Sequence, residues 1–247
     1  MVRLSVNVNK VATLRNSRGG ALPSVVEAAR VCIDAGAHGI TVHPRADERH
    51  ITRLDVPALG HLLAPYRRTV EFNIEGDPRP DLLQMLREAR PHQCTLVPVR
   101  PGEITSQAGW PPETPPDHLR AAVADLRQLG IRVSLFIEPE EPAVKWAASI
   151  GADRVELYTE PFAKAFKAGE DAAERSFRHY LAAASLAHAL GLGINAGHDL
   201  DLDNLVLFRT LPHLDEVSIG HAIVSRAVFL GLATVVREYL ERLDQTP

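Results

Sequence analysis

The segment AGAHGITVHPRADERH (residues 35–50) shows the pattern that decides the fold. A helical stretch ends at small residues and glycine, a short β-rich run follows, and that run stops at a histidine with charged residues behind it. Polar residues or a histidine also stand at expected strand ends in VNVNK at 6–10, NAGHDL at 195–200 and SIGHAI at 218–223. A (β/α)8 barrel presents its catalytic groups in this way, at the carboxyl ends of its strands.

β-rich runs and helical stretches alternate along all 247 residues. We expect strands at 3–8, 39–43, 69–73, 93–98, 131–137, 153–158, 192–196 and 214–219. Helical patterns lie near 23–36, 54–64, 79–89, 116–129, 140–150, 170–190, 201–210 and 221–242. This alternation predicts a parallel sheet, and the length predicts one α/β domain over 1–247, a TIM barrel. A doubly wound open sheet would usually carry a glycine-rich phosphate fingerprint after the first strand, where this chain has Asn-Val-Asn-Lys.

Composition excludes several classes of partner. The formal net charge is -4 and no basic block occurs, which argues against binding to nucleic acid. The start of the chain lacks a signal-peptide core, and no apolar run approaches the roughly 18 residues of a membrane span. The two cysteines, Cys32 and Cys94, lie in apolar stretches, as expected of reduced, buried thiols. We therefore expect a cytoplasmic protein.

One segment, PVRPGEITSQAGWPPETPPD at 98–117, differs from the rest of the chain because it is rich in proline and glycine. It follows the fourth expected strand, on the face where a barrel carries its active site. Loops of this length inside a compact domain are usually functional, commonly as lids. A lid over the active site and a proline-stiffened surface loop are both consistent with this composition.

The segments after the last two strands favour a phosphate site. In many barrels these two loops and a helix N-terminus bind phosphate. Gly197 and Gly220 allow backbone N–H groups to approach an anion, and a helix beginning near His221 directs its positive end there. Asn7 and Arg18 lie on or after the first strand, which neighbours the eighth in a closed barrel. The alternative is that these glycines serve only tight turns.

Two histidines and one arginine lie close together after the second expected strand. His43, Arg45 and His50 lie within eight residues, and a guanidinium pairs bidentately with phosphate oxygens. This favours a second anion site, the alternative being a solvated charged loop. Zinc or manganese ligation by histidines 43, 50, 198 and 221 with Glu156 is the less favoured interpretation, because no dense ligand spacing occurs.

Two carboxylates lie inside apolar strands, Glu71 in VEFNIE and Glu156 in VELYTE. Burial would raise their pKa values toward those of a base that works near neutrality, unless each forms a structural ion pair. Alternation places Glu71 and Asn73 on one face of their strand, with Glu75 just beyond. We expect at least one of these carboxylates to point into the cavity.

Taken together, the motifs resemble the pyridoxine 5′-phosphate synthase family, barrel enzymes that close the pyridine ring in one route to vitamin B6. The matching strings are VNxxxxATLRNxRG at 6–19, GITVHxRxDxRHI at 39–51, LVP…E(I/V)T at 96–105, VSLFI at 133–137, NAGHxL at 195–200 and IGHAI at 219–223. They span essentially the whole chain, and their combination is highly specific.

The resemblance implies condensation of 1-deoxy-D-xylulose 5-phosphate with 3-amino-2-oxopropyl phosphate, releasing phosphate and water, without metal or organic cofactor. It implies that His43 and Glu71 accept protons. His198 would donate a proton, and Glu156 would stabilise the transition state. The residues implied to bind the amino-ketone phosphate are Asn7, Arg18, Asp199, Gly220 and His221. Those implied to bind the deoxyxylulose phosphate are Arg45, His50 and Thr105, with Asn9 and Lys10. The family also implies an octamer, with Arg18 placed at a neighbouring subunit's site.

Two positions depart from the commoner family pattern. Asn9 and Lys10 replace an Asp-His pair, so an amide and an ammonium stand where a carboxylate and an imidazole are usual. Asp199 replaces a glycine, which adds a negative charge beside an expected phosphate site. A role through the backbone N–H at position 199 would tolerate this change.

Two other functions fit such a barrel, a different phosphosugar aldolase or isomerase and a phosphosugar-binding protein without catalysis. A Schiff-base aldolase needs a lysine in a late strand, and 153–158 and 192–196 contain none. A binding protein would have lost proton-transfer residues, whereas His43, Glu71 and His198 are present. The sequence therefore favours the synthase.

Overall fold

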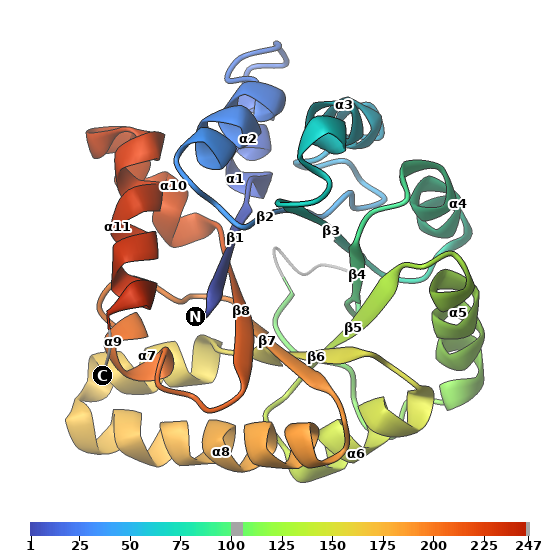
Figure 1. Cartoon of the computed structure of the whole chain (residues 1–247), viewed down its shortest axis with the longest axis vertical. Coiled ribbons are helices and arrows are strands. Elements are labelled where there is room, and N and C mark those ends of the chain that lie inside the picture. Colours follow the sequence, from blue (N-terminus) through green and yellow to red (C-terminus); the bar gives the residue numbers. More distant parts are fainter. Residues whose placement is uncertain (100–105, 246–247) are drawn as a thin grey trace.

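Eight parallel strands close into a barrel in which each strand pairs with its neighbours in chain order, and β8 pairs with β1. The structure is a computed structural model and describes residues 1–99 and 106–245. The strands are β1 (Arg3–Asn7), β2 (Gly39–Val42), β3 (Glu71–Gly76), β4 (Gln93–Leu96), β5 (Arg132–Ile137), β6 (Arg154–Tyr158), β7 (Gly193–Gly197) and β8 (Leu214–Ile219). The expected TIM barrel is confirmed (Figure 1).

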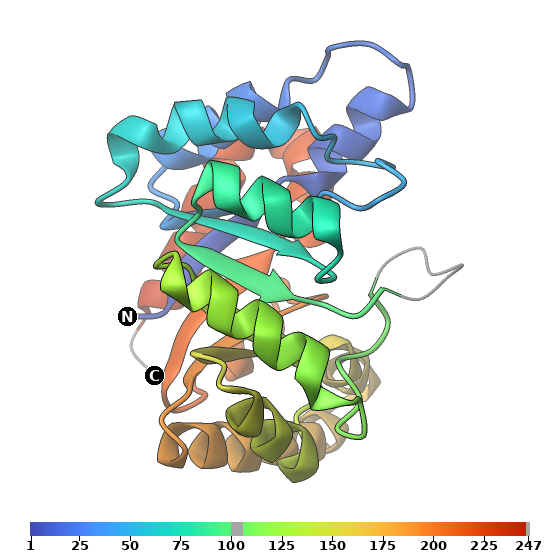
Figure 2. The same ribbon diagram turned by 90° about the vertical axis from the view of Figure 1, so that its right-hand side faces the viewer.

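The helices surround the strands on the outside of the barrel (Figures 1 and 2). They are α1 (Asn9–Asn16), α2 (Val25–Asp34), α3 (Asp55–Leu63), the short 3-10 turn η1 (Ala64–Tyr66), α4 (Pro80–Ala89), α5 (Pro116–Gln128), α6 (Glu141–Ile150), α7 (Glu160–Ala168), α8 (Glu170–Ala189), α9 (Leu205–Phe208), α10 (His221–Leu230) and α11 (Leu232–Asp244). No helix within the described ranges combines the length and apolar character that crossing a membrane requires.

The helices differ from expectation at three places. Helices α1 and α7 follow β1 and β6 directly, where the sequence analysis expected no helix. The last expected helix, 221–242, is two helices, because Gly231 adopts a left-handed φ of +85° that interrupts the turn. The extra helices place polar residues near the carboxyl ends of β1 and β6.

Alternation along the strands gives the barrel a polar interior. Residues such as Leu4, Ile40 and Ile74 are fully buried between the sheet and the helices. Their neighbours along the strands point inward, since their side chains meet across strands that do not pair. Thr95 of β4 hydrogen-bonds to Glu156 of β6, for example, at 3.4 Å. The apolar core is thus the layer between barrel and helices, and the interior carries hydrogen-bonding groups.

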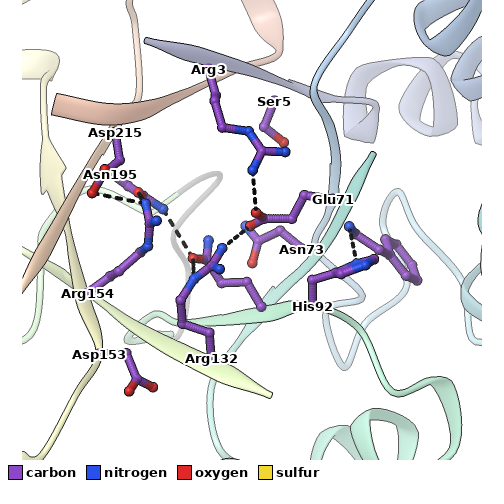
Figure 3. A network of polar contacts seen from close by, with 12 residues as sticks. Arg3, Ser5, Glu71, Asn73, His92, Arg132, Asp153, Arg154, Asn195 and Asp215 are labelled. Atoms are coloured by element: carbon purple, nitrogen blue, oxygen red, sulfur yellow. Dashed lines mark hydrogen bonds and ion pairs between the residues drawn. The ribbon is translucent and has the colours of Figure 1, made fainter. Parts of the chain in front are cut away.

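The amino end of the barrel is closed by arginines and carboxylates (Figure 3). Glu71 Oε1 lies 2.6 Å from an Arg132 nitrogen, and Glu71 Oε2 lies 3.5 Å from an Arg3 nitrogen. Arg154 donates to Asn195 Oδ1 at 2.7 Å and pairs with Asp215 at 3.2 Å. The three arginines therefore pair with Glu71 and Asp215, whereas burial, and secondly the charge of Glu71, raise the pKa of the buried Glu216 at this end to about 8.

Four side-chain latches tie the strands together at the same end. Each odd-numbered strand donates one backbone N–H to a side chain just before, or at the start of, the next strand. The bonds run from Leu4 to His38 Nδ1 (3.1 Å), Phe72 to His92 Nδ1 (2.9 Å), Val133 to Asp153 Oδ2 (2.9 Å) and Ile194 to Asp215 Oδ2 (2.9 Å). The barrel thus repeats one device four times at its stability face.

The third strand starts later than the sequence predicted. It runs over 71–76 instead of 69–73, because Thr69 and Val70 close a turn by bonding to the carbonyl of Tyr66. Glu71 is consequently the first residue of β3, and Glu75 lies near its carboxyl end. This shift decides which carboxylate reaches the face that carries catalytic groups.

We predict that the His38 latch makes folding stability depend on pH. Burial, and secondly Arg3, lower the pKa of His38 below its usual 6.5. The stability it contributes is therefore present above about pH 6.5 and is lost as the pH falls from there through the lowered pKa. His38→Asn keeps an acceptor for Leu4 N–H but cannot be protonated. Over this pH range the free energy of unfolding of the variant should therefore fall by about 1 kcal/mol less than that of the unmodified protein. Denaturant unfolding from pH 7.5 to 5 measures both proteins; parallel stability curves would contradict the prediction.

Candidate active site

Polar side chains from five strands, and a glycine after a sixth, lie toward the carboxyl end of the barrel. Each stands on the last residues of a strand or directly after it, where the parallel strands bring their ends together. They are Asn7 at the end of β1, His43 after β2, Glu75 in β3, Glu156 in β6, His198 after β7, and Gly220 after β8.

His43 and Glu75 form a buried pair at the centre of this group. His43 Nδ1 lies 3.9 Å from Glu75 Oε2, and both residues are at least nine-tenths buried. Asn7 donates to the same carboxylate oxygen at 3.4 Å. Burial raises the pKa of Glu75 to about 7, since no arginine or lysine within the described ranges pairs with it. Glu75 therefore gains or loses a proton near neutral pH.

His43 is held as a neutral ring. Burial lowers its pKa well below the usual value, and His50, Arg45 and Arg79 lower it further by their positive charge. No group in the described part of the chain hydrogen-bonds to Nε2, although that atom is buried. With Nδ1 turned to Glu75, the lone pair of Nε2 can accept a proton.

Glu156 is a second buried carboxyl, next to the first. Burial, and secondly the charge of Glu75, raise its pKa well above the usual value. Its Oε2 lies 3.4 Å from Thr95 Oγ1, which lies 3.2 Å from Asn73 Oδ1. A protonated Glu156 can donate along this chain, or to a negative charge that develops beside it.

The backbone at His198 is held in a strained conformation. His198 and Asp199 both have left-handed φ values, +88° and +61°. Thr159 is fully buried, and its hydroxyl donates to the carbonyl of Gly197 at 2.8 Å and contacts that of His198. The His198 ring packs edge-on against Tyr158, with 5.1 Å between ring centres. The ring is thus fixed between β6 and β7 while one-fifth of it stays exposed.

Asp199 takes a left-handed position that favours glycine and that aspartate tolerates. Its Oδ2 lies 3.5 Å from His198 Nδ1, and this contact leads the causes that lower the pKa of Asp199. The carboxylate is therefore held beside the His198 ring.

A positively charged region surrounds His50. Burial, and secondly the positive charges of Arg45 and Lys10, lower the pKa of His50 to about 4. Asn9 Oδ1 accepts the backbone N–H of His43 at 2.9 Å, which ties the start of α1 to the end of β2. An aspartate at position 9 could accept the same bond, so the amide retains that contact.

Helix α10 begins at the same end of the barrel. A Cβ on Gly220 would lie 2.8 Å from the carbonyl oxygen of Asn7, so only glycine fits between β8 and β1. The first N–H groups of a helix lack partners within it and carry partial positive charge, which suits an anion. His221 is exposed beside them.

Three expected site residues stand apart. The structure places Glu71 at the amino end of the barrel, bonded to Arg132 and Arg3, and so does not bring it near His43. Arg18 is exposed in the turn after α1. Thr105 lies outside the described residues, as does part of the 98–117 segment. The described part of that segment is anchored by Trp110, which donates to the carbonyls of Leu96 and Phe136.

Sequence reasoning gave no role to two buried side chains at this site. Thr95 and Thr159 each bond to a candidate catalytic residue or its backbone. Thr159 could have been identified from the sequence, because LYTE at 157–160 places a hydroxyl directly after a strand. Within the described ranges, no three His, Cys, Asp or Glu residues gather closely enough to hold a metal ion.

Comparison with known proteins gives a consistent result. Residues 4–245 match the family described as pyridoxal phosphate biosynthesis protein PdxJ. The chain is 51% identical over 244 residues to pyridoxine 5′-phosphate synthase of Porphyromonas gingivalis, covering 98% of this chain and 99% of the relative. It is 49% identical over 254 residues to the protein of that name from Leptospira biflexa, covering 99% and 98%.

Solved structures with little sequence identity share the fold. Thiamine phosphate pyrophosphorylase from Pyrococcus furiosus superposes with a TM-score of 0.61 at 13% identity, covering 98% of this chain and 96% of that one. Phosphoribosyl anthranilate isomerase from Thermus thermophilus superposes with a TM-score of 0.59 at 18% identity, covering 98% of both chains. These likenesses concern the barrel alone.

We predict that Gly197→Ala disturbs Glu156. A Cβ at position 197 would lie 2.3 Å from Glu156 Oε1, so the buried carboxyl would have to move. The expected loss is about 1–3 kcal/mol of unfolding free energy, as for other overpacked sites. Gly60→Ala is the control, because it adds a methyl in open space within helix α3. Equal unfolding free energies of Gly197→Ala and the unmodified protein in denaturant would contradict the prediction.

Proposed function

This chain belongs to the pyridoxine 5′-phosphate synthase family of vitamin B6 biosynthesis, and from that premise we propose the reaction and the residues that perform it. It condenses 3-amino-2-oxopropyl phosphate with 1-deoxy-D-xylulose 5-phosphate and yields pyridoxine 5′-phosphate, phosphate and water. The observation that carries the proposal is the buried pair His43–Glu75 beside Glu156 at one end of the barrel. Ring closure requires several proton transfers, which such a group can provide.

His43 is the proton acceptor, and Glu75 is the carboxylate that acts with it. The neutral ring and the unoccupied Nε2 support the first role. A pKa of about 7 and the 3.9 Å approach to Nδ1 support the second, because the carboxylate can stabilise the imidazolium once it forms. Glu75 thus takes the place that we expected Glu71 to fill.

His198 donates a proton, and Glu156 stabilises the transition state. The contact with Asp199 and the packing against Tyr158 orient the His198 ring for this role. Burial raises the pKa of Glu156 and so favours its protonated form, which can donate a hydrogen bond to an oxygen that gains negative charge.

Two phosphate groups bind at two positive regions. One is the start of α10 at Gly220–His221 beside Asn7, with the backbone at 199 and Arg18 as expected partners. The other is the region around His50, formed by Arg45 and Lys10 with Asn9, and Thr105 is its expected further partner. Holding both substrates removes much of the entropic cost of joining them. The 98–117 segment is the proposed lid over these sites.

We also propose that the chain forms a homo-oligomer, an octamer by family likeness, in the cytoplasm. Val228, Phe229 and Leu230 at the end of α10 are exposed apolar residues, which supports association with another copy. The thiols of Cys32 and Cys94 are buried and free, which suits a reducing compartment. Light scattering on a sizing column tests the assembly.

To test the function, the purified protein is treated with a chelator and then mixed with both substrates. Phosphate release is measured together with the pyridoxine 5′-phosphate product. Formation of both supports the synthase and the proposal that no metal is needed. Tight binding without product would contradict the proposed function.

We predict that substitution of Glu75 lowers kcat, whereas substitution of Glu71 lowers stability. Glu75→Gln removes the carboxylate beside His43 and should lower kcat by about 10²–10⁴-fold. Glu71→Gln, the matched control on the same strand, should lower stability by loosening the bonds to Arg132 and Arg3, with kcat kept within about threefold. A severe loss of kcat in Glu71→Gln with full activity in Glu75→Gln would overturn the assignment.

A further inference from the structure

Arg79 lies in the segment between β3 and α4, next to the catalytic group but outside every motif described above. Its side chain is 14% exposed and ion-paired on two sides, 2.7 Å from Asp77 Oδ1 and 2.9 Å from Asp81 Oδ1. It also donates to the carbonyl of Pro44, the residue directly after His43. One guanidinium therefore joins the segment after β2 to the segment after β3.

These two segments carry the two members of the proposed proton-accepting pair. Glu75 precedes Asp77 by two residues, and His43 adjoins Pro44. The 3.9 Å separation of His43 Nδ1 from Glu75 Oε2 thus depends on how the two strand ends are held together. The planar fork of arginine can bond to a carbonyl and a carboxylate at once, whereas a lysine ammonium offers a single point of charge.

We propose that Arg79 is a positioning residue, which fixes His43 against Glu75 through Pro44 and Asp77. The inference rests on the proposed function, since it concerns the same pair. Arg79 acts through those two residues and not on the substrate. The flanking family motifs end at residue 51 and begin at residue 96, so Arg79 lies outside both.

The positive charge of Arg79 also acts on His43. The groups that face His43 are Glu75 from β3, Arg45, Asp47 and His50 from the segment after β2, and Arg79 from the segment after β3. Arg79 is among the charges that lower the pKa of His43. Removing this cation should raise that pKa, so His43 becomes protonated at a higher pH. Because the base must be neutral, the acid limb of kcat/KM should move to higher pH.

The experiment compares Arg79→Gln and Arg79→Lys with Arg53→Gln as the matched control. Arg53 pairs with the same Asp81 at 3.2 Å but is largely exposed and has no bond to Pro44. Proton NMR of the histidine rings measures the pKa of His43 directly, with His43→Gln to assign its signal. The pH profile of kcat/KM and the thermal midpoint are measured on the same proteins.

We expect Arg79→Gln to raise the pKa of His43 by about half a unit or more, with the acid limb moving in parallel. Its kcat should fall about 10- to 100-fold, the range that a small misplacement costs. Arg79→Lys should leave the pKa unchanged and still lower kcat, and Arg53→Gln should change neither. An unchanged His43 titration in Arg79→Gln, or the same change in Arg53→Gln, would overturn the proposal. If the protein makes no product at all, the NMR titration still decides the role of Arg79, while the proposed function fails separately.

Discussion

Buried charge inside the barrel is the constraint on which the rest of the structure depends. Strand alternation sends apolar side chains outward to the helices, so the inward positions are left to polar groups. A charge in such a place is costly unless it is paired, and otherwise its pKa shifts. The two ends of this barrel meet that constraint in different ways.

At the amino end, arginines pair with two carboxylates, and among the described residues there only Glu216 keeps a pKa that burial raises, to about 8. Arg3 and Arg132 pair with Glu71, and Arg154 pairs with Asp215 (Figure 3). Four latches also tie adjacent strands at this end. At the carboxyl end, Glu75 and Glu156 lie together without such partners among the described residues, and burial raises the pKa of both. The arginines near this end, Arg45 and Arg79, instead lower the pKa of His43 and so favour its neutral ring. Stability and proton transfer are thereby assigned to opposite ends of one polar interior, as is general for this architecture.

Most of the fold could be predicted from the sequence, because the alternation of strands and helices is regular and the strand ends carry polar residues. The start of β3 could not be predicted. TVEFNIEG at 69–76 alternates throughout, and only the turn at Tyr66 decides that the strand begins at Glu71. That difference of two residues moves Glu71 to the amino end and places Glu75 beside His43. The positions of Thr159 and Arg79 depend on contacts between segments distant in sequence, which local patterns do not record.

The departure at Asn9–Lys10 also has a physical explanation. The amide of Asn9 accepts the His43 N–H as a carboxylate could, and Lys10 adds a cation to the region around His50. Asp199 stands where the backbone is left-handed and directs its carboxylate toward His198. Both departures preserve the backbone contacts at their positions and change the charge nearby.

Carbon-13 NMR titration of the glutamate side-chain carboxyls tests the central claim most directly. The account predicts a resonance that titrates near pH 7 and disappears in Glu75→Gln, beside the raised titrations of Glu156 and Glu216. If that resonance persists unchanged in Glu75→Gln, or if no carboxyl other than that of Glu216 titrates near neutrality, the assignment of Glu75 as the titrating carboxylate beside His43 is contradicted.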